Sequence, residues 1–203
     1  MDLRSVSNII QRGGTMLFTA RCKAFQTEEG QQKAYETCVK HGIDALVVIG
    51  GDGSFRGCQA IAKKGIKCIG IPGTIDNDIA CSDYTIGYDT ALNTSIQMCD
   101  RLRDTARSHE RCSVVEVMGR HCGDLALNAG IACGATAIIV PEIPFDFEKD
   151  ILEKINDAVK TGKHHYIIMV AEGVGGSQEI AKRIEEVTGI ESRAAILAHV
   201  QRG

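Results

Sequence analysis

The chain has 203 residues, of which 44% are hydrophobic and 24% charged, an ordinary composition for a folded globular protein with no sign of disorder. A net charge of −3, without any run rich in lysine or arginine, argues against binding to nucleic acid or to a membrane surface. The nine cysteines include no CxxC pair, and we find no signal peptide and no apolar run near the ~20 residues of a membrane span. We therefore expect reduced thiols and a cytoplasmic protein.

Strands and helices alternate along the first half of the chain. Residues 16–19 form a possible short strand, and acidic residues near the start of 27–40 indicate a helix there. Apolar runs at 46–49 and 68–71 predict two buried strands, and apolar residues at helical spacing predict a helix over 54–64 between them.

The second half continues this alternation. Asp89 can cap a long helix that has apolar residues on one face. Further strands are expected over 112–117, 137–140, 165–171 and 194–200, and further helices up to about Gly134, over 147–160 and over 178–187. This order favours an α/β fold, with a parallel sheet flanked by helices on both faces.

A glycine-rich loop, GGDGS at residues 50–54, follows the first of the two apolar strands and leads into a helix. Its backbone N–H groups can point at an anion, and the glycines permit close approach. The carboxylate of Asp52 would repel a phosphate unless a divalent cation stood between them, as Mg²⁺ does in nucleotide sites. We interpret the loop as a metal–nucleotide site, and a simple Asp-Gly turn is the alternative.

A second polar loop, PGTIDND at residues 72–78, follows the next apolar strand. It puts Thr74, Asp76 and Asp78 at the carboxyl edge of the expected sheet, where ligands bind in open α/β sheets. An aspartate within reach of an alcohol can take its proton while that oxygen attacks phosphorus. The alternative, a solvated acidic turn, fits less well because Ile75 and Ile79 interleave with the polar residues.

In the second half of the chain, two expected strands are also followed by residues that could bind a ligand. Met118, Gly119 and Arg120 follow one apolar strand, and Glu172 follows another. An arginine fork suits phosphate oxygens, and a carboxylate suits sugar hydroxyls, so this edge could hold a sugar phosphate.

Five motifs now occur in order: GGDGS, PGTIDND, MGRHCGD at 118–124, AEGV at 171–174 and HVQRG at 199–203. Together they resemble the bacterial-type ATP-dependent 6-phosphofructokinase family (phosphofructokinase A). The resemblance runs from Ile9 to the last residue but covers only the middle of a typical member, so we expect an internal fragment that lacks both ends. It implies two doubly wound three-layer αβα lobes with mainly parallel sheets, a nucleotide lobe over 1–88 and a sugar-phosphate lobe over 89–203, with the active site in the cleft between them.

The resemblance also implies an activity, the phosphorylation of fructose 6-phosphate by MgATP to fructose 1,6-bisphosphate, the committed step of glycolysis. By this resemblance Asp76 is the base, Asp52 holds Mg²⁺, and Thr74 and Arg120 stabilise the transferring group. The nucleotide would meet the following residues: Arg21, Cys22, Gly51, Asp52, Gly53 and Ser54. The sugar phosphate would meet the following: Thr74, Asp76, Asp78, Met118, Gly119, Arg120, Glu172, His199 and Arg202.

Two arginines have a special place in the family. Arg111 and Arg193 match positions that reach into the site of a neighbouring subunit, which implies a homotetramer with shared sites. Without the resemblance, both would be interpreted as exposed surface charges.

The family's effector site lies between subunits. Its positions match Arg103, Gly134, Ala135, Thr136 and Lys163. Thr136 stands where well-regulated members carry a metal-binding glutamate, and Thr161 stands where some carry arginine. Because a hydroxyl is a poor substitute for a carboxylate on Mg²⁺, we expect a weak or altered response to ADP.

Other functions stay open. Pyrophosphate-dependent relatives share much of the scaffold but tend to carry an Asp and a Lys at the positions of Gly53 and Gly73, which favours ATP here. NAD kinases and diacylglycerol kinases share the GGDG loop but lack the PGTIDND and MGR motifs. A fragment that binds ligand without turnover is a further alternative.

Overall fold

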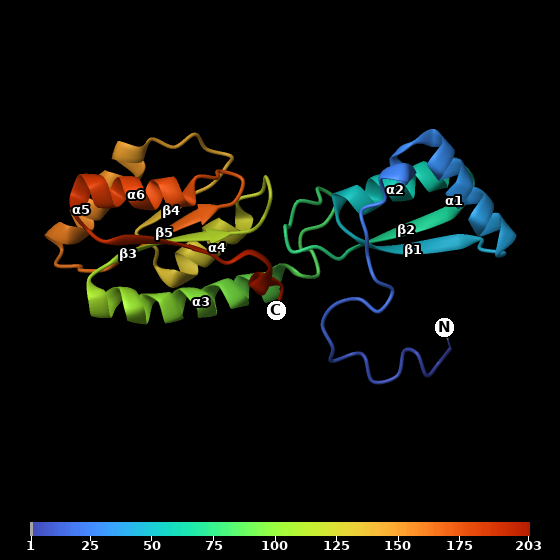
Figure 1. The fold of residues 1–203 in the computed structure, drawn as a ribbon, viewed down its shortest axis with the longest axis horizontal. Coiled ribbons are helices and arrows are strands. Elements are labelled where there is room, and N and C mark those ends of the chain that lie inside the picture. The colour runs from blue at the N-terminus through green and yellow to red at the C-terminus, as the bar shows by residue number, and fades with distance from the viewer. Residues whose placement is uncertain (1) are drawn as a thin grey trace. The chain divides into compact units, whose positions relative to one another are not determined.

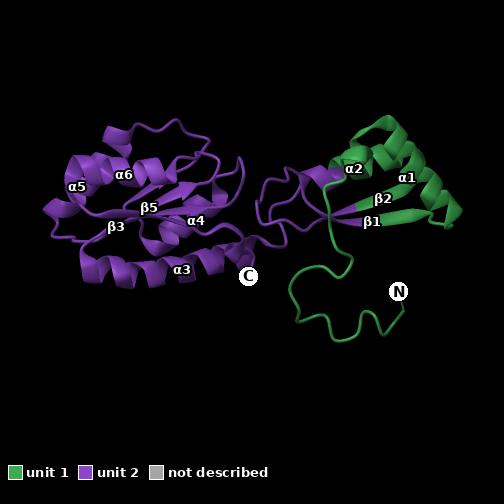
Figure 2. Ribbon diagram, viewed as in Figure 1, with its two compact units in different colours: residues 1–47, 56–69 green, residues 48–55, 70–203 purple. Residues whose placement is uncertain are grey.

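The computed structural model describes residues 2–203, which form two compact units (Figure 2). Unit 1 contains the residues up to Val47 together with Arg56–Ile69, and unit 2 contains Val48–Phe55 and Gly70–Gly203. The bounds of these units differ from those of the two ligand-binding lobes expected from the sequence, 1–88 and 89–203. The division into ligand-binding lobes stays a prediction.

The first elements along the chain include the two strands of a small sheet. They are η1 (Lys23–Gln26), α1 (Glu28–Lys40), β1 (Ala45–Gly50), α2 (Asp52–Lys63) and β2 (Lys67–Pro72). Lys67 N–H donates to the Asp44 carbonyl where the strands start, and Gly73 N–H donates to the Gly50 carbonyl where they end. Both strands therefore point the same way, and the loops that follow them lie at one edge.

Unit 2 contains a parallel sheet of four strands in the order β4-β5-β3-β6. Its elements are α3 (Tyr88–His109), β3 (Cys112–Val117), α4 (Asp124–Cys133), β4 (Ala137–Ile139), the π-helix η2 (Glu148–Leu152), α5 (Glu153–Lys160), β5 (Tyr166–Ala171), α6 (Ser177–Thr188), β6 (Ser192–Ile196) and the 3-10 helix η3 (Ala198–Arg202). Val117 pairs with Ala171 at the carboxyl ends of β3 and β5, so the loops that follow these strands begin side by side.

Helices cover both faces of this sheet (Figure 1), and a hydrophobic core lies between each helical layer and the sheet. On one face Val114 and Ile168 pack with α5 and α6, and on the other Val115 and Met169 pack with α3 and α4. Successive side chains of a strand point to opposite faces, which is why strands buried on both sides are apolar throughout. The expected α/β fold with a parallel sheet between helical layers is confirmed.

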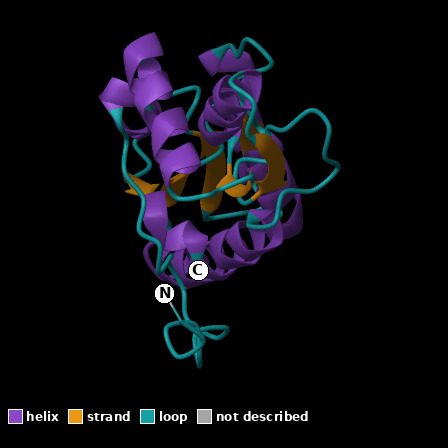
Figure 3. Cartoon of the chain, turned by 90° about the vertical axis from the view of Figure 1, so that its right-hand side faces the viewer, coloured by secondary structure: helices purple, strands orange, loops and turns teal. Residues whose placement is uncertain are grey.

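Four local predictions were wrong. The strands at 46–49 and 68–71 form but are not buried, since Val47 is 64% exposed, Ile49 69% and Ile69 66%. Residues 16–19 form no strand: like the rest of 2–22 they contain no helix or strand (teal in Figure 3), and Phe18 has a left-handed φ of 57°. The last strand ends at Ile196 rather than at residue 200, and η3 follows it. Asp89 does not cap α3, because the helix starts one residue earlier with Gly87 at its N-cap and Asp89 inside its first turn.

Candidate functional site

The loop after β2 carries a buried acid. Asp76 is 7% exposed, its N–H donates to Thr74 Oγ1 (3.2 Å), and its Oδ2 pairs with Arg120 Nε (3.3 Å). Three of the predicted catalytic residues, Thr74, Asp76 and Arg120, are thus brought together within unit 2.

Burial raises the pKa of the Asp76 carboxyl above its ordinary value. The negative charges of Asp78 and Glu172 raise it further, and the guanidinium of Arg120 opposes them. A carboxylate with a raised pKa accepts a proton more readily than an exposed aspartate, which suits a general base.

The glycine-rich loop lies against this acidic loop. The Gly73 N–H donates to the Gly50 carbonyl (3.0 Å), and a Cβ added to Gly51 would lie only 3.4 Å from the Cβ of Thr74, so the two loops lie side by side. Helix α2 begins at Asp52, and the first N–H groups of a helix have no partner within it. A Cβ on Gly53 would meet no atom within 4 Å, which leaves open space beside those N–H groups.

The loop after β3 is held by the first residue after β5. Oε1 of Glu172 accepts hydrogen bonds from the N–H groups of Gly119 (3.2 Å) and Arg120 (2.7 Å). Gly119 has a φ of 136°, which side chains rarely permit, and a Cβ on Gly173 would lie 2.1 Å from the Arg120 carbonyl oxygen. The predicted residues of both strand ends therefore form one hydrogen-bonded group.

Two further polar residues fix these loops, and sequence reasoning missed both. Asn77 Nδ2 donates to Asp124 Oδ2 (2.9 Å), and its Oδ1 accepts from the N–H of Thr85 (3.0 Å). Gln201 is fully buried and accepts a hydrogen bond from the N–H of Met118 (2.7 Å). The available signal was an amide side chain inside each motif, PGTIDND and HVQRG, flanked by residues assigned to the ligand.

The other motif residues lie around this group or away from it. His199 and Arg202 are exposed on η3, next to Gln201. Asp78 is exposed, and its charge acts on Asp76. Arg21 and Cys22 are exposed residues of unit 1, and their predicted place beside a nucleotide stays a prediction.

Arg111 and Arg193 lie at the opposite, amino-terminal edge of the sheet. Arg111 directly precedes β3, and Arg193 is the second residue of β6. Both bind Glu191, with Arg111 Nε at 2.6 Å from Oε2 and Arg193 Nη2 at 2.8 Å from Oε1. These arginines hold the pKa of Glu191 below its usual range. The structure therefore does not bring them to Asp76 of the same chain.

The predicted effector residues form a basic group of their own. Lys163 Nζ donates to Thr136 Oγ1 (3.2 Å), and Arg103 Nη2 donates to the carbonyl of Cys133, next to Gly134. Burial, and then the charge of Arg103, lowers the pKa of Lys163. The expectation that Thr136 is a poor metal ligand stays a prediction.

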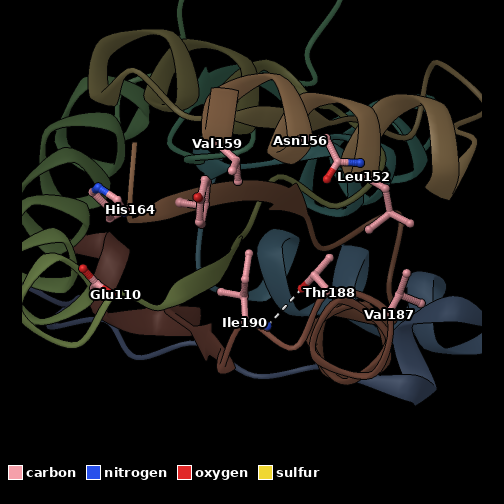
Figure 4. Close-up of a pocket in the computed structure, with 9 residues that line it drawn as sticks. Glu110, Leu152, Asn156, Val159, His164, Val187, Thr188 and Ile190 are labelled. Carbon is pink, nitrogen blue, oxygen red and sulfur yellow. Dashed lines mark hydrogen bonds between the residues drawn. The ribbon is translucent and has the colours of Figure 1, made fainter. Parts of the chain in front are cut away.

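A hollow at the amino-terminal edge of the sheet is lined by none of the predicted site residues (Figure 4). Leu152, Asn156 and Val159 face it from η2 and α5, and Thr188 and Ile190 close it from the end of α6. Thr188 Oγ1 accepts a hydrogen bond from the N–H of Ile190 (3.1 Å). Polar and apolar side chains both line the hollow, and none of them is an arginine or lysine that could bind a phosphate.

The glycine-rich loop offers one carboxylate, that of Asp52, as a ligand for a metal ion that a substrate would also bind. Within residues 2–203 no group of three or more His, Cys, Asp or Glu side chains could hold a metal ion by itself. Mg²⁺ commonly binds through one or two carboxylates plus substrate phosphates, so the single carboxylate of Asp52 in the glycine-rich loop has the chemistry to hold it with a phosphate ligand. In the same described part of the chain, no helix is long and apolar enough to cross a membrane.

Comparisons with known proteins agree with one another. The family profile described as Phosphofructokinase matches residues 1–203. The chain is 61% identical to ATP-dependent 6-phosphofructokinase 1 of Clostridium perfringens and 58% identical to ATP-dependent 6-phosphofructokinase of Clostridium botulinum strain Hall. Both matches cover 100% of this chain but 63% of the relative, so the chain spans less than two thirds of their length.

Solved structures give the same result. The phosphofructokinase of Saccharomyces cerevisiae matches with a TM-score of 0.83 and 33% identity, over 94% of this chain and 29% of that one. Pichia pastoris phosphofructokinase in the T-state matches with a TM-score of 0.84 and 34% identity, over 94% of this chain and 24% of that one.

Proposed function

Because the chain belongs to the phosphofructokinase family, we propose that it performs the ATP-dependent phosphorylation of D-fructose 6-phosphate to fructose 1,6-bisphosphate, a step of glycolysis in the cytoplasm. One observation carries this proposal. A buried aspartate with a raised pKa, Asp76, is paired with Arg120 and lies on a loop in contact with the glycine-rich loop.

The proposed reaction uses Asp76 as the general base. Its carboxylate takes the proton of the sugar 1-hydroxyl while that oxygen bonds to the γ-phosphorus of ATP. The bond from the γ-phosphorus to its bridging oxygen breaks, and ADP leaves with the electron pair. Thr74 and Arg120 stabilise the charge on the transferring group, and Gly51, Gly53 and Ser54 cradle the nucleotide phosphates.

Magnesium is the proposed cofactor. Asp52 would hold it together with the nucleotide phosphates, and when bound it neutralises negative charge on those phosphates. Asp52 lies in the first turn of α2, next to the N–H groups proposed to bind the same phosphates.

The sugar phosphate is proposed to bind at the other strand ends. Glu172 would accept from sugar hydroxyls, beside Met118, Gly119 and Asp78, and His199 and Arg202 would bind the 6-phosphate. Arg111 and Arg193 would serve the site of a neighbouring subunit in a homotetramer, which fits their position at the far edge of the sheet from Asp76.

Gly73 favours ATP over pyrophosphate as the donor. A Cβ there would lie 2.7 Å from Ile49 Cγ2, so a lysine would require Ile49 to move. Gly53 leaves open space that a nucleotide phosphate could use and that a carboxylate would make repulsive. We expect transfer from MgATP and none from pyrophosphate in parallel assays, and the reverse preference would refute the assignment of the donor.

A binding titration separates the enzyme from a ligand-binding protein. We expect the 203-residue chain to bind fructose 6-phosphate and MgATP in calorimetry and to release ADP in a coupled assay. Binding of both without ADP release would favour the non-catalytic alternative, and binding of neither would overturn the proposal.

The effector group predicts weak regulation. Arg103, Lys163 and Thr136 supply cations and a hydroxyl but no carboxylate for a metal. We expect ADP to change activity little, as measured by initial rates at increasing ADP with fructose 6-phosphate held low. A strong, saturable activation would contradict this expectation.

A further inference from the structure

Gln201 is a polar side chain with no exposure to solvent. Its Oε1 accepts from the Met118 N–H (2.7 Å), and its Nε2 donates to Ser95 Oγ (2.9 Å). Ser95, which is also fully buried, donates its own proton to the carbonyl of Ala91 (2.7 Å). Every step of this chain of hydrogen bonds pairs a donor with an acceptor, so the orientation of the amide is determined by its partners.

These hydrogen bonds join three separate elements. Ser95 lies on α3, Met118 begins the loop after β3, and Gln201 lies on η3. Within η3 only Gln201 is buried, whereas His199, Val200 and Arg202 are exposed. One short helix therefore presents a histidine and an arginine outward while the amide of Gln201 bonds the loop that carries Gly119 and Arg120.

We infer that Gln201 is a positioning residue that sets the geometry of the sugar-phosphate half of the site. This inference rests on the proposed function, because it assumes that the Met118 loop and η3 bind the same ligand. Without the amide, the partly buried Met118 N–H would lose this acceptor, and a donor left unpaired away from water is costly. The loop and η3 would then lose their shared anchor, while the loop at residues 50–54 would be unaffected, since Gln201 bonds no residue there.

The test compares Gln201→Met with the unmodified chain. Methionine keeps a similar length but neither bonds Met118 N–H nor donates to Ser95. We expect the dissociation constant of fructose 6-phosphate to rise about tenfold or more, which corresponds to the loss of one buried hydrogen bond. We expect the dissociation constant of MgATP to stay unchanged. Hydrogen exchange at the Met118 amide should accelerate relative to exchange at the amides of β5.

Two further variants keep the test decisive. Ser95→Ala removes the hydrogen bond from Gln201 Nε2 and the one to the Ala91 carbonyl but leaves Met118 paired with Gln201. It should therefore weaken sugar-phosphate binding in the same direction but less, even if Gln201→Met fails to fold. Ser192→Ala is the control: it removes another buried hydroxyl, at the start of β6, and should leave both affinities unchanged.

The outcomes distinguish the two proposals. If the unmodified chain binds no fructose 6-phosphate, the proposed function fails and this inference fails with it. If it binds and Gln201→Met binds equally well, or loses both ligands to the same extent, only the positioning role is refuted. Selective loss of the sugar phosphate, with faster exchange at Met118, supports it.

Discussion

At the scale of single residues, the environment of Asp76 decides its chemistry. Burial is the largest cause of its raised pKa, and the nearby charges of Asp78 and Glu172 act in the same direction. Arg120 Nε lies 3.3 Å from Asp76 Oδ2 and pairs with the ionised carboxylate. This ion pair offsets part of the free-energy cost of ionising a buried carboxyl, and the rest appears as the raised pKa. The same arrangement that suits a base therefore lowers the stability of the fold when Asp76 is ionised.

Asp76→Asn should separate activity from stability. Turnover should fall by about 10² to 10⁴, the usual contribution of a positioned base. The folded-state pKa is raised, so protonation of Asp76 contributes stability that is fully present below the unfolded pKa and is lost as pH rises through the folded pKa. At neutral pH the variant should therefore melt at a higher temperature than the unmodified chain.

Thermal unfolding across pH checks this prediction. The difference in melting temperature should narrow as the solution is acidified through the folded pKa, because the unmodified carboxyl is then neutral as well. Retained turnover would remove Asp76 from the mechanism. A lower melting temperature for the asparagine variant at neutral pH would mean that the ion pair with Arg120 outweighs the cost of burial.

Alanine substitutions at Gly173 and Gly53 test the space around two glycines, one crowded and one open. Gly173→Ala should destabilise the fold by about 1–3 kcal/mol, since its Cβ would lie 2.1 Å from the Arg120 carbonyl oxygen and force the loop to shift. Gly53→Ala, in the first turn of α2 with open space around it, should raise stability by up to about 1 kcal/mol. Denaturant unfolding measures both, and equal effects would refute the steric argument.

At the scale of elements, helix ends follow local rules. Thr27 caps α1 by accepting a hydrogen bond from the N–H of Gly30 (3.1 Å). Glycines in the left-handed conformation end α4 at Gly134 (φ 60°) and α6 at Gly189 (φ 71°). These signals are read from neighbouring residues, which is why the expected start and end of α1 agree closely with the structure.

Thr27→Ala should cost about 1 kcal/mol of stability, the usual value of a lost N-cap. Thr37→Ala is the matched control, because Thr37 lies exposed inside the same helix and bonds only the Lys33 carbonyl. Alanine has the higher helix propensity there, so stability should stay the same or rise slightly. Urea unfolding followed by far-UV circular dichroism measures both, and a Thr27 variant as stable as the unmodified chain would refute the cap.

At the scale of the whole molecule, the nine cysteines are all free thiols but differ in their surroundings. Cys99 and Cys112 are buried in the helical layers and sheet of unit 2, and burial raises the pKa of each to about 12. Cys22 and Cys81 are exposed. Because the thiolate is the reactive form, burial should make the first pair inert.

Alkylation at mildly alkaline pH should therefore modify Cys22 and Cys81 first. Cys99 and Cys112 should react only after denaturant unfolds the chain, as followed by mass spectrometry of the labelled peptides. Rapid labelling of Cys112 in the folded chain would show that β3 opens readily, against the dense burial of that strand.

Most of the elements, and the polar residues at their ends, could be predicted from the residues alone. The bounds of β3 were predicted as they stand, and its burial on both faces explains the apolar run. Parallel strands direct their carboxyl ends to one edge of their sheet, so Arg120 and Glu172 could be expected to meet after β3 and β5. That Asp76, after β2 of the other sheet, pairs with Arg120 could not be expected from strand direction.

The hydrogen-bond partners of the polar groups, in contrast, could not be predicted before the folded chain was known. Gln201 meets Ser95, Asn77 meets Asp124, and Arg111 meets Glu191, each across a long separation in the chain. The strand expected to reach residue 200 stops at Ile196, where its pairing with Glu116 of β3 ends. Periodicity and capping depend on residues a few positions away, whereas the partner of a buried amide depends on which distant segment folds against it.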